Sequence, residues 1–430
     1  MKRTLSIMAV LMCLASVAMR AQTRTPQAPK FQVDPMWPKP LPNHWILGSV
    51  TGLAVDSKDH VWIAQQGAST LTTNTEMGTG TTPQTAENCC TAAPPILEFD
   101  PAGALVSNFG GPSATNDYQW PRCIQGLSVD AKGNVWVAGN AGPVGQRGAR
   151  QCTGGVAGLT SDPDAPPAAP RGGAAAAAGG RGGAGGGAGR GGAPAAPAAP
   201  VLADAHILKF GPGGKFLKQI GMPGKSDGPE STTSLNRPTH VEVDAAANEV
   251  YVADAGNRRV VVFDSESGAY KRHFGAYGTK PDAAVDLGRY DAAAPAKQFR
   301  SLSCVRLAKD GMVYVCDRNE NRIQVFQKDG KYLKEIFVSK TTLGGADGGS
   351  AWDVAFSRDN AQQFMYVANG WDKKVVIMQR STGNVLGTFG QGGRLAGEFV
   401  GVGSVALDSK GNLYTGETFE GKRVQKWLNR

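Results

Sequence analysis

Apolar and polar residues alternate in pairs of short segments that recur six times along the chain. In each pair the two segments are joined by a turn rich in Asp, Lys, Gly or Asn, and the second segment is rich in β-branched and aromatic residues. Alternation with a period of two is typical of strands, and a polar turn between two such runs is typical of an antiparallel hairpin. The six predicted hairpins cover residues 52–65, 126–139, 240–254, 304–317, 353–369 and 404–416.

Further strands follow each hairpin. A third strand is predicted after every copy, at residues 96–99, 207–210, 260–263, 323–326, 375–378 and 424–427. A fourth strand follows a short turn in the first five copies, as at residues 215–220, 332–336 and 385–389. Four antiparallel strands that repeat roughly every 45–65 residues are typical of the blades of a β-propeller.

The last copy ends after three strands, whereas one strand-like run, residues 31–34, precedes the first copy. Pairing these two segments would complete the last blade and cover two sheet edges that would otherwise invite aggregation. We therefore predict an all-β, six-bladed β-propeller over residues 22–430, with its last blade closed by the N-terminal strand. The predicted blades are residues 46–110, 120–220, 236–275, 299–338, 350–390, and 400–428 together with 31–34.

The turn between the second and third strands has a signature of its own. An acidic or amide residue is followed five positions later by a basic one, in the pairs Asp254 and Arg259, Asp317 and Arg322, Asn369 and Lys374, and Glu417 and Lys422. This pattern resembles the NHL repeat, and the chain is similar to NHL six-bladed propellers over nearly all of its length outside the segments described next. Since the pairs recur in four blades, we interpret them as structural turn contacts and not as catalytic groups.

Two segments stand apart from the repeats. Residues 1–21 combine Lys2 and Arg3, an apolar stretch and small residues, which is the order of a secretory signal peptide. A loop insertion is predicted at residues 141–203, and within it residues 165–200 contain only Ala, Gly, Pro and Arg, so no side chain there can fill a core and disorder is expected. The chain is therefore expected to be secreted or periplasmic, with no membrane span in the mature protein.

The net charge of +9 first suggests a nucleic-acid partner. Six of the basic residues, however, lie in the predicted signal (Lys2, Arg3, Arg20) and in the low-complexity segment (Arg171, Arg181, Arg190). The charge that remains on the repeats is small, which argues against binding to phosphate backbones. We predict no nucleic-acid partner.

Six cysteines lie beyond the predicted signal. Cys304 and Cys316 occupy facing ends of the fourth hairpin, so we predict that they form a disulfide, which an exported chain can retain. The connectivity of Cys89, Cys90, Cys123 and Cys152 stays open, and structural bridging is favoured because no zinc-binding spacing is present.

The segment 48–66 and the blade pattern after it also resemble the peptidyl-hydroxyglycine amidating lyase, a zinc-dependent six-bladed propeller. The resemblance implies three channel histidines, a tyrosine base and an arginine for the substrate carboxylate. In this chain the three histidine positions are Gln125, Ser303 and Gly403, the tyrosine is absent from the turn that follows Asp254, and the arginine position is Gln66. Gln, Ser and Gly do not replace imidazole as zinc ligands, so the scaffold resembles the lyase and the active site does not.

Repeat alignment places one residue of each inner strand at the central channel. These candidate ligand-binding residues are Thr51, Gln125, Thr239, Ser303, Trp352 and Gly403. They can hydrogen-bond or stack on a ligand but cannot easily transfer protons near neutral pH. The alternative is that Trp352 and the small residues only plug the channel. Nearby loops contribute residues of unknown facing: Arg122, Asn140, Arg237, Arg258, Arg318, Asn369, Trp371 and Glu417.

Two functional hypotheses remain open. The favoured one is an exported, non-catalytic propeller that binds a peptide, glycan or protein partner through its loop face and channel, with no catalytic residue, metal or cofactor. The alternative is a divergent amidating-lyase-like enzyme with a relocated site, for which zinc or calcium would be the expected metal.

Overall fold

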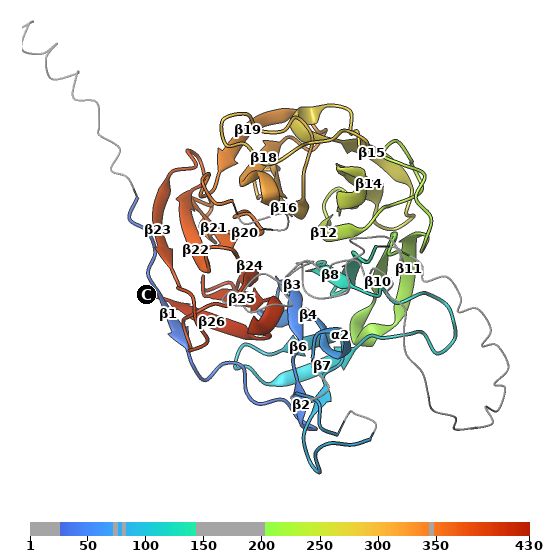
Figure 1. Cartoon of the computed structure of the whole chain (residues 1–430), viewed down its shortest axis with the longest axis vertical. Coiled ribbons are helices and arrows are strands. Elements are labelled where there is room, and N and C mark those ends of the chain that lie inside the picture. Colours follow the sequence, from blue (N-terminus) through green and yellow to red (C-terminus); the bar gives the residue numbers. More distant parts are fainter. Residues whose placement is uncertain (1–25, 72–75, 80–82, 143–202, 344–347) are drawn as a thin grey trace, which may run out of the picture.

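Six four-stranded antiparallel sheets surround a central axis in the computed structural model (Figure 1). The structure describes residues 26–71, 76–79, 83–142, 203–343 and 348–430. The predicted signal peptide and most of the predicted loop insertion lie outside these residues. No helix in the described part of the chain is long and apolar enough to cross a membrane.

The six sheets are consecutive along the chain and correspond to six propeller blades. Blades one to three contain β3 (Ser49–Val55), β4 (Val61–Gln66), β6 (Ile96–Phe99) and β7 (Leu105–Phe109); β8 (Ile124–Val129), β9 (Val135–Gly139), β10 (His206–Phe210) and β11 (Phe216–Gly221); and β12 (Pro238–Asp244), β13 (Glu249–Asp254), β14 (Arg259–Asp264) and β15 (Tyr270–Phe274). Blades four to six contain β16 (Leu302–Leu307), β17 (Val313–Asp317), β18 (Arg322–Phe326) and β19 (Tyr332–Phe337); β20 (Asp353–Phe356), β21 (Phe364–Asn369), β22 (Lys374–Gln379) and β23 (Val385–Phe389); and β24 (Val402–Leu407), β25 (Leu413–Glu417), β26 (Val424–Asn429) and β1 (Phe31–Asp34).

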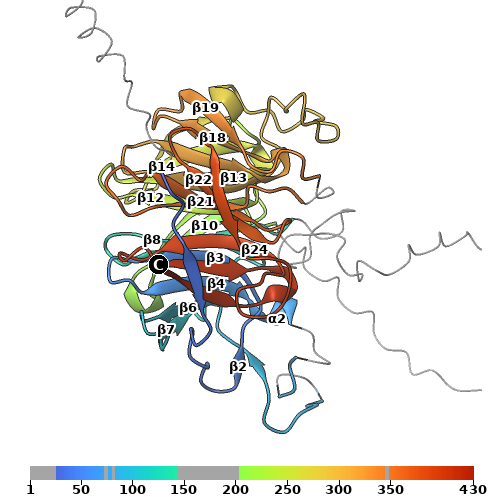
Figure 2. The same cartoon turned by 90° about the vertical axis from the view of Figure 1, so that its left-hand side faces the viewer.

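Short elements decorate this ring. The strands β2 (Trp45–Ile46) and β5 (Thr91–Ala92) form a small parallel pair, and α2 (Gly67–Thr70) follows β4. Single 3₁₀ turns follow some of the strands, among them η4 (Arg318–Glu320) after β17 and η5 (Phe419–Gly421) after β25. Figure 2 shows the blades stacked around the axis in side view.

The core lies between neighbouring blades. The second strands β4, β13 and β17 are buried at every position, because both of their faces pack against other sheets. The outer strands β7 and β23 instead alternate between exposed and partly buried positions, since one of their edges faces solvent. One cluster, for example, joins Tyr251 and Val260 of blade three to Val305 and Val313 of blade four. Each interface therefore depends on two blades at once.

The N-terminal strand closes the ring as predicted. β1 pairs antiparallel with β26, with Phe31 opposite Asn429 and Asp34 opposite Lys426. The ring of Phe31 also packs against Tyr366 and Phe389 of blade five, with centroids 5.4 and 5.0 Å away. The two ends of the described chain thus meet in one blade, which confirms the predicted all-β, six-bladed architecture.

The inner strands share a local irregularity at the channel. The register with the second strand shifts by one residue in β3, β8, β12, β16 and β24, which leaves Thr51, Gly126, Thr239, Ser303 and Gly403 without a partner across the ladder. A bulge of this kind re-aims the side chain. Gly126 has φ +70°, and a Cβ atom there would lie 2.5 Å from the Thr239 carbonyl oxygen of the next blade. Glycine is required at that position because the two blades approach so closely.

The predicted disulfide is present in blade four. Cys304 on β16 lies directly opposite Cys316 on β17, the two are bonded, and their Cα atoms are 4.9 Å apart. Both side chains are fully buried. Cys89 and Cys90, whose connectivity the sequence left open, pair with each other. Cys152 lies outside the described residues, so its connectivity stays open.

Candidate functional site: the mouth of the central channel

All six candidate channel residues come together around the propeller axis. Thr51, Gln125, Thr239, Ser303, Trp352 and Gly403 line one narrow cavity of about 20 Å³. A cavity of this volume holds about one water molecule. The six residues thus lie together, the channel at their level is almost filled, and their binding of a ligand stays a prediction.

Three of these residues use their hydroxyl groups to hold neighbouring blades together. Thr51 Oγ1 donates to the Ile124 carbonyl oxygen at 2.8 Å, and Thr239 Oγ1 donates to that of Leu302 at 3.0 Å. Ser303 Oγ donates to the Ala351 carbonyl oxygen at 2.9 Å. In each case the bond runs from one blade to the next, to the inner strand for Ile124 and Leu302 and to the residues just before the inner strand for Ala351. The alternative that these residues only fill the channel therefore explains where each of the three hydroxyl groups donates its hydrogen bond.

Trp352 is a fixed platform beneath the mouth. Its side chain is buried, Nε1 donates to the Gly349 carbonyl oxygen at 2.8 Å, and the Phe419 ring packs edge-on with centroids 5.6 Å apart. The guanidinium of Arg318 lies 4.3 Å from the centroid of the Trp352 ring. The indole face is thus already covered by a cation from blade four, and not left open for a ligand ring.

A buried ionic cluster closes the channel below this level. Arg306 of β16 makes two hydrogen bonds to the Asp353 carboxylate, at 3.0 and 2.8 Å, and a longer contact to Glu242 at 3.4 Å. Arg306 lines both the narrow cavity and a cavity of about 180 Å³ on its other side, so its side chain lies between the two. Burial raises the pKa of Glu242, and burial together with Arg306 lowers the pKa of His240 well below its ordinary value. The channel is consequently blocked, and its one buried histidine is held neutral.

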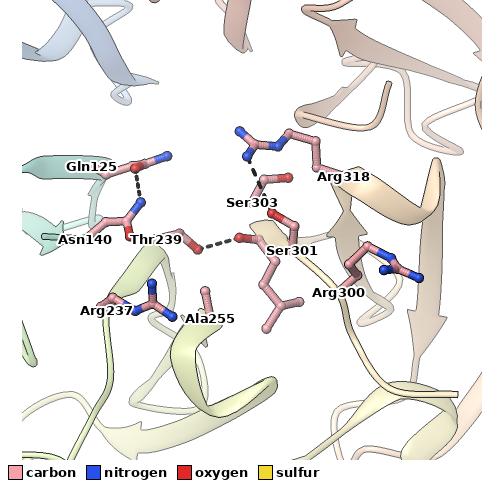
Figure 3. Close-up of a pocket in the computed structure, with 10 residues that line it drawn as sticks. Gln125, Asn140, Arg237, Thr239, Ala255, Arg300, Ser301, Ser303 and Arg318 are labelled. Carbon is pink, nitrogen blue, oxygen red and sulfur yellow. Dashed lines mark hydrogen bonds between the residues drawn. The ribbon is translucent and has the colours of Figure 1, made fainter. Parts of the chain in front are cut away.

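Above the narrow cavity, the mouth of the channel opens into a cavity of about 80 Å³ (Figure 3). Its lining comes from blades two, three and four: Gln125, Asn140, Arg237, Thr239, Ala255, Arg300, Ser301, Leu302, Ser303 and Arg318. Of the loop residues whose facing the sequence could not establish, Asn140, Arg237 and Arg318 line this cavity. The sequence analysis did not identify Arg300 and Ser301 as candidates. They lie in the loop that leads into β16, where the alternation of apolar and polar residues does not predict which side chains face the channel.

The carboxylates near the mouth are engaged by their own blades. Asp254 accepts hydrogen bonds from the Asn236 backbone N–H at 2.6 Å and from Arg259 at 2.9 Å. Asp317 accepts the backbone N–H groups of Arg300 and Ser301, at 2.9 and 2.8 Å, and also bonds Arg322. The Asp254–Arg259 and Asp317–Arg322 pairs are fully buried. These two turn pairs are therefore structural contacts, as interpreted from the repeat.

The other two turn pairs do not form as the spacing predicted. Glu417 bonds Arg423, six positions on, while Lys422 contacts Glu76 and Glu420. Asn369 bonds Asp372 at 2.8 Å instead of Lys374. The reason is local, because Lys422 adopts the left-handed conformation at the end of η5 and the strand pairing resumes only beyond it. Arg423 therefore takes the position beside Glu417 that the spacing predicted for Lys422.

Within the described residues, one group of side chains has the composition of a metal site. Asp56, His60 and Glu98 lie in blade one, at the end of β3 opposite the channel mouth, with ligand atoms within 4.8 Å of one another. His60 Nδ1 is 2.7 Å from Glu98 Oε1, and Asp56 Oδ1 accepts the backbone N–H groups of Lys58 and His60. These three side chains therefore already form hydrogen bonds, either with one another or with the backbone of the hairpin turn. At the mouth itself, the positions where the lyase resemblance implies histidines carry Gln125, Ser303 and Gly403.

Comparisons with known proteins identify no family for this chain. No family model matches the chain, and no curated protein matches it. Among solved structures, a virginiamycin B lyase from Staphylococcus aureus has a TM-score of 0.43 at 10% identity, with 92% of this chain and 88% of that chain covered. A streptogramin B lyase has a TM-score of 0.46 at 10% identity, with 93% and 98% covered. At these identities the activity of those lyases has no bearing on this chain.

Proposed function

We propose that the protein is an exported, non-catalytic binding propeller that takes its ligand at the channel mouth on the loop face. The supporting observation is the composition of the mouth cavity, whose described lining combines arginines with amides, hydroxyls and apolar groups. The described lining contains no histidine, carboxylate, lysine, tyrosine or cysteine, which are the usual side chains of general acid–base catalysis. The buried disulfide supports an oxidising compartment, in agreement with the predicted signal peptide.

A site at the mouth is also suited to recognition by its shape. The ionic cluster around Arg306 blocks the channel below, so a ligand can enter only from the loop face and cannot pass through. Three blades contribute to the lining, so a ligand seated there contacts loops far apart in the sequence. A peptide, a glycan or the exposed loop of a protein partner could extend from the mouth across those loops.

The alternative is a divergent, lyase-like metalloenzyme with a relocated site. The single observation in its favour is the group formed by Asp56, His60 and Glu98, which contains ligand types suited to zinc or calcium. Its three side chains are partly buried, Asp56 and His60 in the hairpin turn at the other end of β3 and Glu98 on the neighbouring strand β6. This hypothesis therefore predicts chemistry in blade one, away from the mouth.

Metal analysis and ligand screening separate the two hypotheses. The purified protein is analysed for stoichiometric zinc and calcium and assayed for turnover of a hydroxyglycine-terminated peptide. Peptide and glycan libraries are then screened by thermal shift, with hits repeated on Gln125→Ala and on the surface variant Lys58→Ala. Ligands whose shift is lost only in Gln125→Ala support binding at the mouth. Stoichiometric metal together with turnover that His60→Ala abolishes would establish the enzyme instead.

A further inference from the structure

We propose that the protein carries a second binding site, for a neutral carbohydrate, in a cavity between the β7–β8 loop and the outer strand β11 of blade two. The volume of this cavity is about 530 Å³, several times that of the mouth cavity, and the two cavities share no residue of their described linings. Most of the lining belongs to the loop, and Gln219 and Pro223 of blade two complete it. The site therefore goes beyond the proposed function at the mouth and does not depend on it.

Two aromatic rings form one wall of this cavity and are supported from behind. The Tyr118 ring packs against Phe216 and Phe210, with centroids 4.9 and 5.2 Å away. The Trp120 ring packs against Phe210 at 5.8 Å. Phe210 is fully buried, whereas Tyr118 and Trp120 are partly exposed and line the cavity. The wall thus extends the hydrophobic core of blade two, and its rings lose little conformational freedom when a ligand stacks on them.

The loop that carries the two rings is held by hydrogen bonds of its own. Ser113 Oγ accepts the backbone N–H groups of Thr115 and Asp117, at 3.2 and 3.1 Å. The carbonyl oxygen of Gln119, which lies between the two aromatic residues, is 2.7 Å from Nε2 of the buried His206. Nε2 donates in this bond, because a carbonyl oxygen can only accept. The backbone between the rings is therefore tied to blade two before a ligand arrives.

Polar groups beside the rings are left unused by the fold. Within the part of the chain that the structure describes, Trp120 Nε1 and the side-chain amides of Asn116 and Gln119 form no hydrogen bond. The Asp117 carboxylate is exposed and accepts the hydroxyl of Thr115 at 2.5 Å. An indole N–H, two amides and a carboxylate together offer both donors and acceptors next to an aromatic surface.

A sugar ring matches this combination of groups. Its C–H groups are weakly positive and stack on the negative faces of aromatic rings, while each of its hydroxyls can both donate and accept hydrogen bonds. An anionic ligand is disfavoured, because the described lining contains no lysine or arginine. A proline-rich peptide also docks on aromatic grooves, but proline has no N–H to donate to Asp117 or to the amide oxygens. The groups present therefore favour a neutral carbohydrate.

Titrations with three neutral trisaccharides test this proposal. Cellotriose, maltotriose and triacetylchitotriose are each added to the full chain, and binding is followed by tryptophan fluorescence and by saturation-transfer NMR. We expect at least one of them to bind at millimolar concentration or below, with little dependence on salt because no charge pair is formed. Tighter binding of choline or of a proline-rich peptide at this cavity, or binding of none of the trisaccharides, would overturn the proposal.

Variants of the cavity locate the bound sugar. Trp120→Ala should weaken the trisaccharide that binds at least tenfold, because both the stacking surface and the indole N–H are lost. Gln119→Ala should weaken it about threefold, through the loss of one hydrogen bond. The matched controls are Trp371→Ala and Gln363→Ala, which remove a partly buried tryptophan and an exposed glutamine of blade five outside the cavity. Both controls should leave the affinity within twofold of wild type.

Thermal unfolding confirms that each variant folds. The Gln119 side chain is exposed, so Gln119→Ala keeps the test valid if Trp120→Ala does not fold. Wild-type affinity in every cavity variant that folds would overturn the proposal.

The second site and the mouth fail separately. A trisaccharide whose affinity falls in Trp120→Ala and not in Gln125→Ala supports the second site, whatever the mouth binds. A trisaccharide whose affinity falls only in Gln125→Ala binds at the mouth, which supports the proposed function and overturns the second site.

Discussion

The central channel contains arginines at two levels, and the groups that surround them differ. In the middle, Arg306 lies between the carboxylates of Asp353 and Glu242, which belong to two other blades. At the mouth, Arg318 lies on the Trp352 ring among hydroxyl and amide groups. A buried cation between carboxylates of two other blades holds those blades together, whereas Arg318 is held against the face of an aromatic ring. The comparison teaches that the surroundings of an arginine, and not its position in the repeat, decide its role.

The largest effect is expected from the middle of the channel. Arg306→Met leaves two buried carboxylates without their cation, and it should lower the free energy of unfolding by about 3–5 kcal/mol. Urea denaturation measures this change. Restoring balance in the triple variant Arg306→Met, Glu242→Gln, Asp353→Asn should recover part of the loss. A loss below about 1 kcal/mol in Arg306→Met would show that the cluster does not hold the blades.

The disulfide of the channel wall comes next. Cys304 directly follows the channel residue Ser303, and its bond to Cys316 ties the first two strands of blade four. Replacing both cysteines by alanine should cost about 3 kcal/mol, since a short closed loop no longer limits the unfolded chain. Thermal unfolding of the double variant, and of the wild type with a reductant that acts on the unfolded chain, checks this value.

A third test uses a paired arginine on the outside of the ring. Hydrogen bonds from Arg272 and Tyr251 lower the pKa of Glu249 to about 2. Since the folded pKa lies below the unfolded one, the stabilisation is complete above about pH 4.5 and is lost as the pH falls toward 2. After screening by solvent, about 1–2 kcal/mol should disappear over this range. Urea unfolding of the wild type and of Glu249→Gln from pH 6 to pH 2.5 isolates the contribution of Glu249 to the free energy of unfolding. If this free energy depends on pH in the same way in both proteins, the prediction is wrong.

The smallest effect on stability is expected at the mouth. Arg318→Gln removes a buried cation–ring contact together with the hydrogen bond to Asn319, and it should cost about 1–2 kcal/mol, less than Arg306→Met. Chemical denaturation of the two variants side by side measures the ratio. Equal losses would remove the distinction between the two levels of the channel and make Arg318 another structural cation.

Much of the fold could be read from local patterns. The alternation of apolar residues predicted the hairpins, and the orphan run at residues 31–34 predicted the strand that pairs with β26. The facing ends of one hairpin predicted the Cys304–Cys316 bond. These predictions succeed because each depends on residues that are close in sequence, or on a strand edge that must be covered.

Predictions of particular side-chain partners were less reliable. A five-residue spacing identified the Asp254–Arg259 and Asp317–Arg322 pairs, but it gave the wrong cation for Glu417, where a left-handed turn brings Arg423 into place instead of Lys422. The predicted channel residues line one cavity, but the hydroxyls of Thr51, Thr239 and Ser303 donate to the next blade, and their binding of a ligand stays a prediction. Spacing reports which residues are near, and it does not report which of several near groups forms the bond.

The sequence by itself determined a ring of six blades, its closing strand and the absence of histidines from the expected channel positions. Only the tertiary structure decided that Arg306 blocks the channel, that Arg318 rests on Trp352, and that Arg237 shares a cavity with Gln125. The physical reason is that these groups come from different blades. Their distances exist only after the ring has closed, and the energy of a charge depends on the groups that closure brings around it.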